Sequence, residues 1–175
     1  MVLHPGSGDN FPGRRWPAAR FGALAGRLAS EADAVVAVTG TRAEAALGRG
    51  VLAASGGRAF DLCGRLGLDD LIGLLAKASL LVANDTGPVH LAAALGVPVL
   101  GLYGPNSPSL YGPRSAGSRA FYRPPACSPC LLNSNYKTSR CLNPVCIRAI
   151  GVDEVMEAAL ARLRAAPPEA AGRGA

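Results

Sequence analysis

The sequence predicts an α/β domain with a Rossmann-like parallel sheet flanked by helices. Short apolar runs alternate with stretches of helical periodicity, and each run closes on a Gly, Asp or Pro signal, as in repeated strand–helix units. Apolar residues make up 49% of the chain and aromatic residues only 5%, which suits buried parallel strands better than a β-sandwich. The 175 residues are enough for one domain with a single core.

The expected strands are continuous apolar runs, and the expected helices carry apolar residues on one face. Pro17 suits the first position of the first helix, and Thr41 with Glu44 forms a capping box at the start of the second. In chain order we expect a strand at 2–3, a loop at 4–15, a helix at 17–29, a strand at 34–38, a helix from 41 to about 48, a strand at 59–63, a helix at 66–78, a strand at 80–83, a helix at 89–95, a strand at 99–103, a long loop at 104–125 and a last helix at 152–163.

The domain is expected to span 1–164, with a cysteine-rich insert at 127–146 and a disordered tail at 165–175.

Composition limits the classes of function. The formal charge of +6 comes from scattered arginines without a basic stripe or interleaved aromatic residues, so an anionic small molecule is expected and nucleic acid is not. Because no apolar run could cross a bilayer and no signal peptide is evident, we expect a cytoplasmic location.

The most informative segment ends a buried strand at Asp85 and starts a helix within three residues. Ligands of open α/β sheets bind beyond the carboxyl ends of the strands. Asp85 or Thr86 can cap the helix, Gly87 lets a ligand approach the backbone, and Pro88 occupies a position whose N–H would be unpaired anyway. His90 follows one turn into the helix. Singly these residues fit a cap, a turn or a packed position, but together they predict a site for a sugar diphosphate.

Residues 85–105, DTGPVHLAAALGVPVLGLYGP, resemble the signature of family 9 glycosyltransferases, the ADP-heptose:lipopolysaccharide heptosyltransferases. Three further segments follow the family's order, and the resemblance extends over residues 3 to about 163; the segments are HPGS at 4–7, RRWP at 14–17 and CSPC at 127–130. The resemblance implies the C-terminal, donor-binding half of a GT-B enzyme. Its activity would be inverting transfer of heptose from ADP-heptose to the inner core of lipopolysaccharide, with no cofactor required.

The resemblance also implies where the donor binds. The segment that includes Pro88 and His90 would hold the diphosphate and sugar, chiefly through Asp85, Thr86 and Gly87. The first loop would reach the phosphates through Ser7 together with Arg14 or Arg15.

Two of these roles have competing interpretations. Arg15, beside Trp16, fits a solvated surface charge equally well. Glu44 matches the glutamate that holds the ribose in the family, but the capping box explains it as well. The loop at 66–68, including Leu68, resembles the stretch whose backbone reads the adenine.

In the family the general base lies near the start of the other domain, so no catalytic residue is expected in this half. We expect the N-terminal acceptor domain to be missing from this chain, as in a truncated gene model, a fragment or an excised domain. Roughly one domain's worth of in-frame codons should then precede Met1. The isolated half should bind donor and turn over little or nothing, and the complete enzyme would meet its lipopolysaccharide acceptor at the inner face of the cytoplasmic membrane.

The clustered cysteines leave two interpretations open. Cys127, Cys130, Cys141 and Cys146 have spacings that a structural tetrahedral zinc could use, although the second pair is wider than usual. Free or locally paired thiols fit the same pattern. Cys63, at a strand end, is interpreted as a small buried hydrophobe.

Other functions fit the sequence less well. A non-catalytic nucleotide-binding module and a transferase for another nucleotide sugar remain as alternatives. A nicotinamide-dependent oxidoreductase is disfavoured because no Gly-x-Gly-x-x-Gly opens a helix. A stand-alone zinc ribbon is disfavoured because the cysteines occupy so little of the chain.

Overall fold

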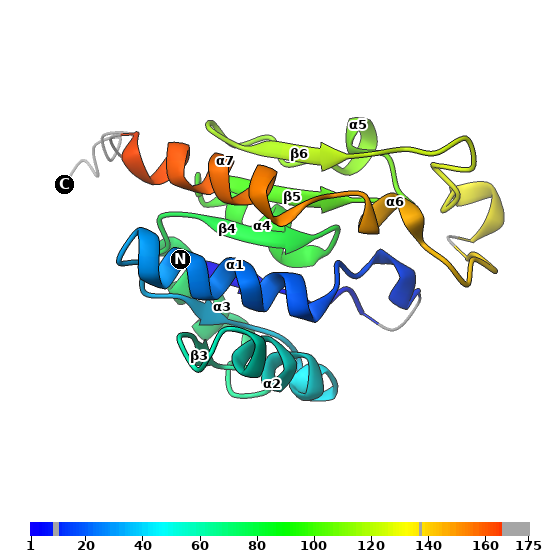
Figure 1. The fold of residues 1–175 in the computed structure, drawn as a ribbon. Helices are drawn as coiled ribbons and strands as arrows, with labels where there is room; N and C mark the ends of the chain where they lie inside the picture. The colour runs from blue at the N-terminus through cyan, green and yellow to red at the C-terminus, as the bar shows by residue number, and fades with distance from the viewer. Residues whose placement is uncertain (9–10, 137, 166–175) are drawn as a thin grey trace.

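The computed structural model describes residues 1–8, 11–136 and 138–165. Within these residues the centre of the molecule is one sheet of six parallel strands with the order β3-β2-β1-β4-β5-β6 (Figure 1). This is the strand order of the doubly wound nucleotide-binding fold, so the predicted fold class is confirmed. The strands are β1 (Val2–His4), β2 (Ala37–Val38), β3 (Phe60–Asp61), β4 (Leu81–Asn84), β5 (Val99–Tyr103) and β6 (Arg119–Tyr122).

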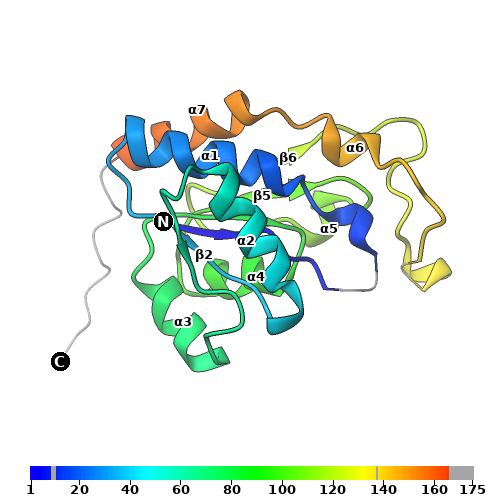
Figure 2. The ribbon, with the colours of Figure 1, turned by 60° about the horizontal axis from the view of Figure 1, so that its bottom comes forward.

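Helices cover both faces of the sheet (Figures 1 and 2). One face carries α1 (Ala18–Glu31), α2 (Ala45–Ala54) and α7 (Val152–Arg164), and the other carries α3 (Leu68–Ala76) and α4 (Gly87–Ala94). The remaining described elements are the short helices α5 (Pro108–Tyr111) and α6 (Val145–Arg148), with 3₁₀ turns at Pro12–Arg14, Arg42–Glu44 and Asn133–Asn135.

Two apolar layers hold the helices to the sheet. Val2 and Leu3 are adjacent in β1, yet they join opposite layers, because successive side chains of a strand point to opposite faces. The larger layer packs β-strand residues such as Leu3 and Leu102 against Phe21 of α1. The smaller layer packs Val2 against Leu75 of α3 and Val89 of α4. Burial on both faces explains why the strands are continuous apolar runs in the sequence.

The predicted end of the second helix near Gly48 is wrong, because α2 continues to Ala54. Gly48 is a packing glycine rather than a terminator, since a Cβ there would collide with the side chains of Asp61 and Cys63. The helix ends instead just before Gly56 and Gly57, whose φ angles of 65° and 74° suit only glycine well.

The predicted loop at 104–125 is also wrong in part, because it contains α5 and β6. β6 is an edge strand in which only Phe121 is buried, so neither an apolar run nor a clear alternation marks it in the sequence. Smaller differences concern boundaries: the strands expected at 34–38 and 59–63 are two residues long, and α1 begins at Ala18, with Pro17 as its N-cap. The expected disordered tail falls almost wholly outside the described residues.

None of the described helices combines the length and the apolar character that a membrane crossing needs.

Candidate functional site

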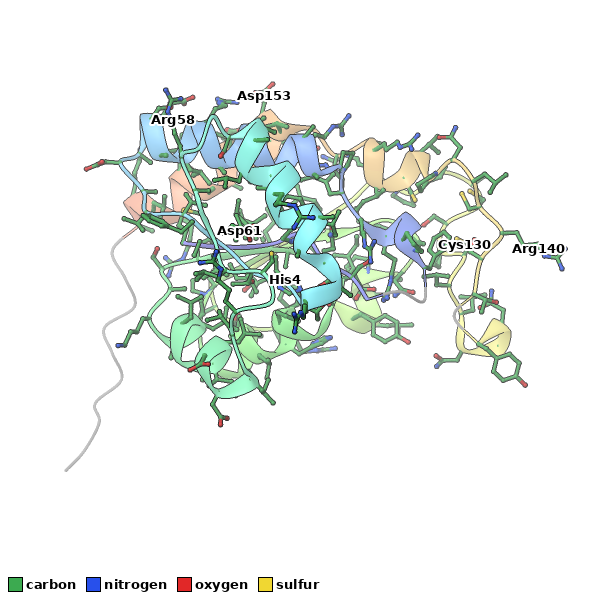
Figure 3. The ribbon with its side chains drawn as sticks, turned by 90° about the horizontal axis from the view of Figure 1, so that it is seen from below. His4, Arg58, Asp61, Cys130, Arg140 and Asp153 are labelled. Carbon is green, nitrogen blue, oxygen red and sulfur yellow. The ribbon has the colours of Figure 1, made fainter. Side chains whose placement is uncertain are left out.

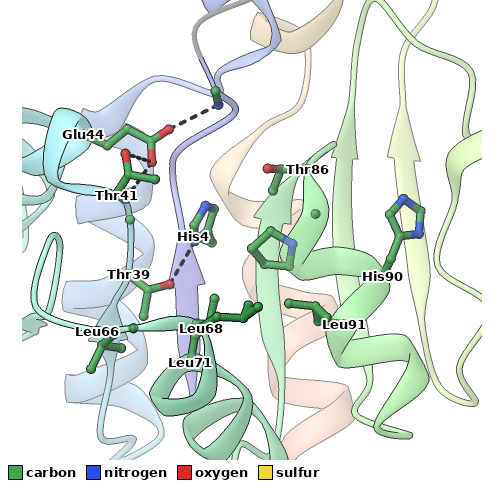
Figure 4. Close-up of a pocket in the computed structure, with 15 residues that line it drawn as sticks. His4, Thr39, Thr41, Glu44, Leu66, Leu68, Leu71, Thr86, His90 and Leu91 are labelled. Atoms are coloured by element: carbon green, nitrogen blue, oxygen red, sulfur yellow. Dashed lines mark hydrogen bonds between the residues drawn. The ribbon is translucent and has the colours of Figure 1, made fainter.

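A cavity of about 680 Å³ opens at the carboxyl ends of β1, β2 and β4 (Figure 4). It lies where the strand order reverses between β1 and β4, the place at which doubly wound sheets bind ligands. One side of the cavity is apolar and includes Leu66, Leu68 and Leu71, while the opposite side is polar. The remaining lining residues are His4, Gly8, Thr39, Gly40, Thr41, Glu44, Gly67, Thr86, Gly87, Pro88, His90 and Leu91.

The start of α4 borders the polar side of the cavity. Thr86 is the N-cap residue, with φ of −160°, but its side chain makes no capping hydrogen bond within the described part of the chain. The expected side-chain cap is therefore wrong. Pro88 has no N–H, and the Val89 N–H donates to the Thr86 carbonyl at 3.1 Å, which leaves the Gly87 N–H at the start of the helix for water or a ligand. A Cβ added at Gly87 would meet no atom within 4 Å, so the backbone there is open to approach. His90 is exposed and lies on the rim of the cavity.

The loop after β1 is fixed to the sheet by Asn84, which ends β4 and is fully buried. Its Oδ1 atom accepts a hydrogen bond from the Trp16 N–H at 2.9 Å, and its Nδ2 atom donates to the carbonyl of Pro5 at 2.8 Å. Nδ2 also lies 3.4 Å from the Gly6 carbonyl. Asn84 is not among the site residues predicted from the sequence, although a polar residue closing a buried apolar strand was a usable signal.

Glu44 holds two loops together, and only 4% of it is exposed. Its Oε1 atom accepts from the N–H groups of Ser7 at 3.1 Å and Gly8 at 3.2 Å. Its Oε2 atom accepts from the N–H of Thr41 at 2.9 Å and from the Thr41 hydroxyl at 3.0 Å. The capping-box interpretation is thus confirmed, and the ribose role stays a prediction. Gly6 is required beside it, because a Cβ there would collide with the Glu44 carboxylate.

The charge of Glu44 is favoured despite its burial. Desolvation pushes the pKa of Glu44 upward, but hydrogen bonds from Thr41 and Gly8, together with the nearby His4, outweigh it and leave the pKa below its ordinary value. The site therefore contains a fixed anion behind the loop that follows β1.

The two arginines and Asp85 form the support of this loop rather than its exposed surface. Arg14 donates to the carbonyl of Ser7, and its Nη1 atom lies 3.7 Å from Oδ2 of Asp85. Arg15 donates to the carbonyl of Gly8 at 2.9 Å and lies 3.9 Å from Oε1 of Glu44, so it is not merely a solvated charge.

Four of the predicted donor-binding residues do not line the cavity, namely Ser7, Arg14, Arg15 and Asp85. Asp85 is 6% exposed and also accepts a hydrogen bond from Asn106, while Ser7 is 2% exposed. Neither residue lines the cavity, so their direct contact with a donor stays a prediction.

His4 ends β1 and lines the cavity, although the sequence analysis assigned it no role. Its Nδ1 atom forms a hydrogen bond of 3.0 Å with the hydroxyl of Thr39, which follows β2. Burial lowers the pKa of His4, and the charge of Glu44 offsets this only in part. The ring is therefore neutral at pH 7.

The clustered cysteines lie apart from this cavity. Cys127, Cys130, Cys141 and Cys146 are free thiols around a separate cavity of about 150 Å³, and Figure 3 shows Cys130 well away from His4. Among the described residues, no group of three or more His, Cys, Asp or Glu side chains is arranged to hold a metal ion. The zinc interpretation therefore stays a prediction.

Cys63, by contrast, is part of the larger core layer, as expected. Burial and a hydrogen bond involving Asp61 raise the pKa of Cys63 to about 12.

A doubly wound parallel sheet with a cavity at its switch point and an uncapped helix beside it defines an α/β domain of the Rossmann-like type. Comparison with known families makes the assignment specific. The model of Glycosyltransferase family 9 (heptosyltransferase) matches residues 1–139, and the chain belongs to this family.

Individual relatives agree with the family. The chain is 36% identical over 114 residues to lipopolysaccharide heptosyltransferase 2 of Escherichia coli, which covers 63% of this chain and 32% of that protein. It is 35% identical over 131 residues to lipopolysaccharide heptosyltransferase 1 of Pseudomonas aeruginosa, covering 75% of this chain and 36% of the relative. The chain thus spans about a third of the length of these curated relatives.

Solved structures show the same fold. The structure of E. coli ADP-heptose LPS heptosyltransferase II superposes with a TM-score of 0.76 and 28% identity, covering 93% of this chain and 45% of that one. A family 9 glycosyltransferase from Veillonella parvula gives a TM-score of 0.73 with 26% identity, covering 93% of this chain and 46% of the other.

Proposed function

We propose that this chain is the donor-binding part of a GT-B glycosyltransferase that transfers heptose with inversion from ADP-heptose to the inner core of lipopolysaccharide. The observation that carries the proposal is the cavity at the switch point, with an apolar side near α3 and the uncapped start of α4 on its polar side. The names of the relatives, lipopolysaccharide heptosyltransferases, support the sugar and the acceptor.

The two sides of the cavity suit the two ends of a nucleotide. A planar base is apolar on its faces and fits among Leu66, Leu68 and Leu71, where the backbone at 66–68 can pair with its edge. The diphosphate fits the start of α4, because the Gly87 N–H and the helix dipole both favour an anion. Arg14 and Arg15 add positive charge on the other side, at the loop that follows β1.

The proposed catalytic base lies outside this chain, in the acceptor-binding half of the enzyme. An inverting transfer needs a base within hydrogen-bond reach of the attacking hydroxyl. The chain described here would orient the donor and stabilise the departing diphosphate, without taking the proton. The complete enzyme would work in the cytoplasm at the inner face of the cytoplasmic membrane, where a lipid-linked acceptor is available.

A matched pair of glycine variants tests the proposal. Neither Gly87 at the start of α4 nor Gly73 on α3 has an atom within 4 Å of an added Cβ, so Gly87→Val and Gly73→Val should both fold. Gly87→Val should lower the affinity for ADP at least tenfold by isothermal titration calorimetry, because the new side chain occupies the path of the phosphates. Gly73→Val should bind ADP like the parent chain, and Asp85→Ala should bind it more weakly.

The titration also separates the alternatives. Equal affinity for ADP in all of these variants, or no ADP binding by the parent chain, would contradict the proposal. Stronger binding of UDP or GDP than of ADP would favour a transferase for another nucleotide sugar. Tight NAD binding without a response to ADP would favour an oxidoreductase instead. ADP binding by a full-length gene product that transfers no sugar would favour a non-catalytic module.

A further inference from the structure

We propose that the Nε2 atom of His4 accepts a hydrogen bond from the nucleoside part of the ligand, through a ribose hydroxyl or the adenine amino group. The inference rests on the proposed nucleotide-binding function and adds a recognition residue to it. The proposed contact of His4, at the end of β1, is with a hydrogen-bond donor of the nucleoside and not with the phosphates.

The position of His4 places its ring between the two sides of the cavity. β1 is central in the sheet, with β2 on one side and β4 on the other, so its last side chain emerges at the switch point. Figure 4 shows His4 between Thr39, which follows β2, and Thr86 at the start of α4. His4 lines the same cavity as the three leucines and the start of α4, so a ligand that fills the cavity can contact this ring.

The partner of Nδ1 decides which nitrogen of the ring carries the proton. The Thr39 hydroxyl lies 3.0 Å from Nδ1 of His4 and 3.4 Å from the Leu3 carbonyl. A hydroxyl has one proton and can accept as well as donate. The Leu3 carbonyl can only accept a hydrogen bond. If the Thr39 hydroxyl donates its one proton to that carbonyl, the hydroxyl must accept a hydrogen bond from Nδ1–H of His4. The neutral ring then carries its proton on Nδ1 and presents a lone pair on Nε2.

A lone pair on Nε2 selects the ligand group that it can bind. An ionised diphosphate offers only acceptor oxygens at neutral pH, so it gains nothing from another acceptor. A nucleoside offers O–H groups on the ribose and an N–H₂ group on adenine, which can donate to Nε2.

Glu44 is poorly placed to satisfy those donors instead. Its two oxygen atoms already accept four hydrogen bonds, from Ser7, Gly8 and Thr41, which fills the capacity of a carboxylate. A ribose hydroxyl could bind Glu44 only by displacing one of these donors, whereas Nε2 of His4 faces the cavity without such a cost.

Nuclear magnetic resonance tests the protonation of the ring directly. The chain has only two histidines, so a ¹⁵N spectrum of the imidazole nitrogens can be assigned by comparison with a His90→Gln variant. We expect His4 to show a protonated Nδ1 and an unprotonated Nε2 at pH 7.5. A proton on Nε2 would overturn the inference.

Ligand analogues then identify the donor group. His4→Asn keeps an amide nitrogen near the place of Nδ1, so it can still bond Thr39, but it has no atom at the place of Nε2. The variant should bind ADP about three- to tenfold more weakly, the range expected for one hydrogen bond. One of 2′-deoxy-ADP, 3′-deoxy-ADP or purine riboside diphosphate, each lacking one of these donor groups, should bind His4→Asn and the parent chain equally well.

The outcomes separate this inference from the proposed function. If the parent chain binds no ADP, both fail. If the parent chain binds ADP and His4→Asn binds it equally well, only the role of His4 fails. If His4→Asn weakens the binding of ADP and of all three analogues by the same factor, the His4 ring affects the shape of the site instead of bonding one ligand group. The inference is then also overturned.

Discussion

Removing the Glu44 carboxylate should destabilise the domain more than any exposed substitution, because four hydrogen-bond donors converge on it. In Glu44→Ala the buried Ser7 N–H loses its partner, which costs about 1–3 kcal/mol, and each bond to a charged acceptor is worth about 1.5–3 kcal/mol. Water can replace the carboxylate at the partly buried donors of Gly8 and Thr41. We therefore expect a loss of roughly 3–5 kcal/mol, a large share of the roughly 5–15 kcal/mol typical of a domain.

Urea unfolding followed by circular dichroism measures this loss. Glu44→Gln should also be destabilised, because its amide NH₂ would face donors that need an acceptor. The pKa of Glu44 is lowered in the folded chain, so its stabilising effect is complete above the ordinary carboxyl pKa of about 4.3 and disappears as the pH falls through the lower folded value. The gap between the parent chain and Glu44→Gln should therefore narrow below about pH 4. A loss below about 1 kcal/mol in Glu44→Ala at pH 7 would refute the reasoning.

Two further predictions concern other parts of the structure. Asn84→Asp should cost about 2–4 kcal/mol in urea unfolding, because a carboxylate would face the carbonyl of Pro5, and an unchanged midpoint would show that the Asn84 hydrogen bonds contribute little. Exposed Cys127 and Cys141 should be alkylated by iodoacetamide long before buried Cys63, whose pKa is raised to about 12, as mass spectrometry of digests can show. Added Zn²⁺ should leave these rates unchanged, and joint protection of the clustered cysteines would instead establish a zinc site.

The sequence predicted most of the sheet, because five of its six strands carry a local signal. Strands β1, β4 and β5 lie in apolar runs, and the alternation of strands and helices predicted that the strands pair in parallel. β6 had no such signal, because Phe121 is its only buried residue. Gly48 gave a misleading signal, because it was interpreted as the end of the second helix. The role of Gly48 in packing depends on Asp61 and Cys63, which lie beside Gly48 only in the folded chain.

The candidate site was predictable only where its residues are close in sequence. Thr86, Gly87 and His90 follow one strand, and the structure places all three around the cavity. The pairing of His4 with Thr39 joins residues 35 positions apart, and that of Asn84 with Trp16 joins residues 68 apart. No local pattern marks such pairs, because parallel strands bring them together only through long crossovers.

The signature around Asp85 therefore combines two physical roles that its sequence does not separate. Thr86 and Gly87 form the surface of the cavity, where a missing cap and a missing side chain leave room for an anion. Asp85 turns away, toward Arg14, and Arg14 in turn holds the carbonyl of Ser7. Substitution of Asp85 should therefore displace Arg14 and the loop that follows β1, in addition to removing any contact that Asp85 makes with a donor. A substitution at Gly87 acts at the surface itself, which is why the two variants test different steps of the same binding event.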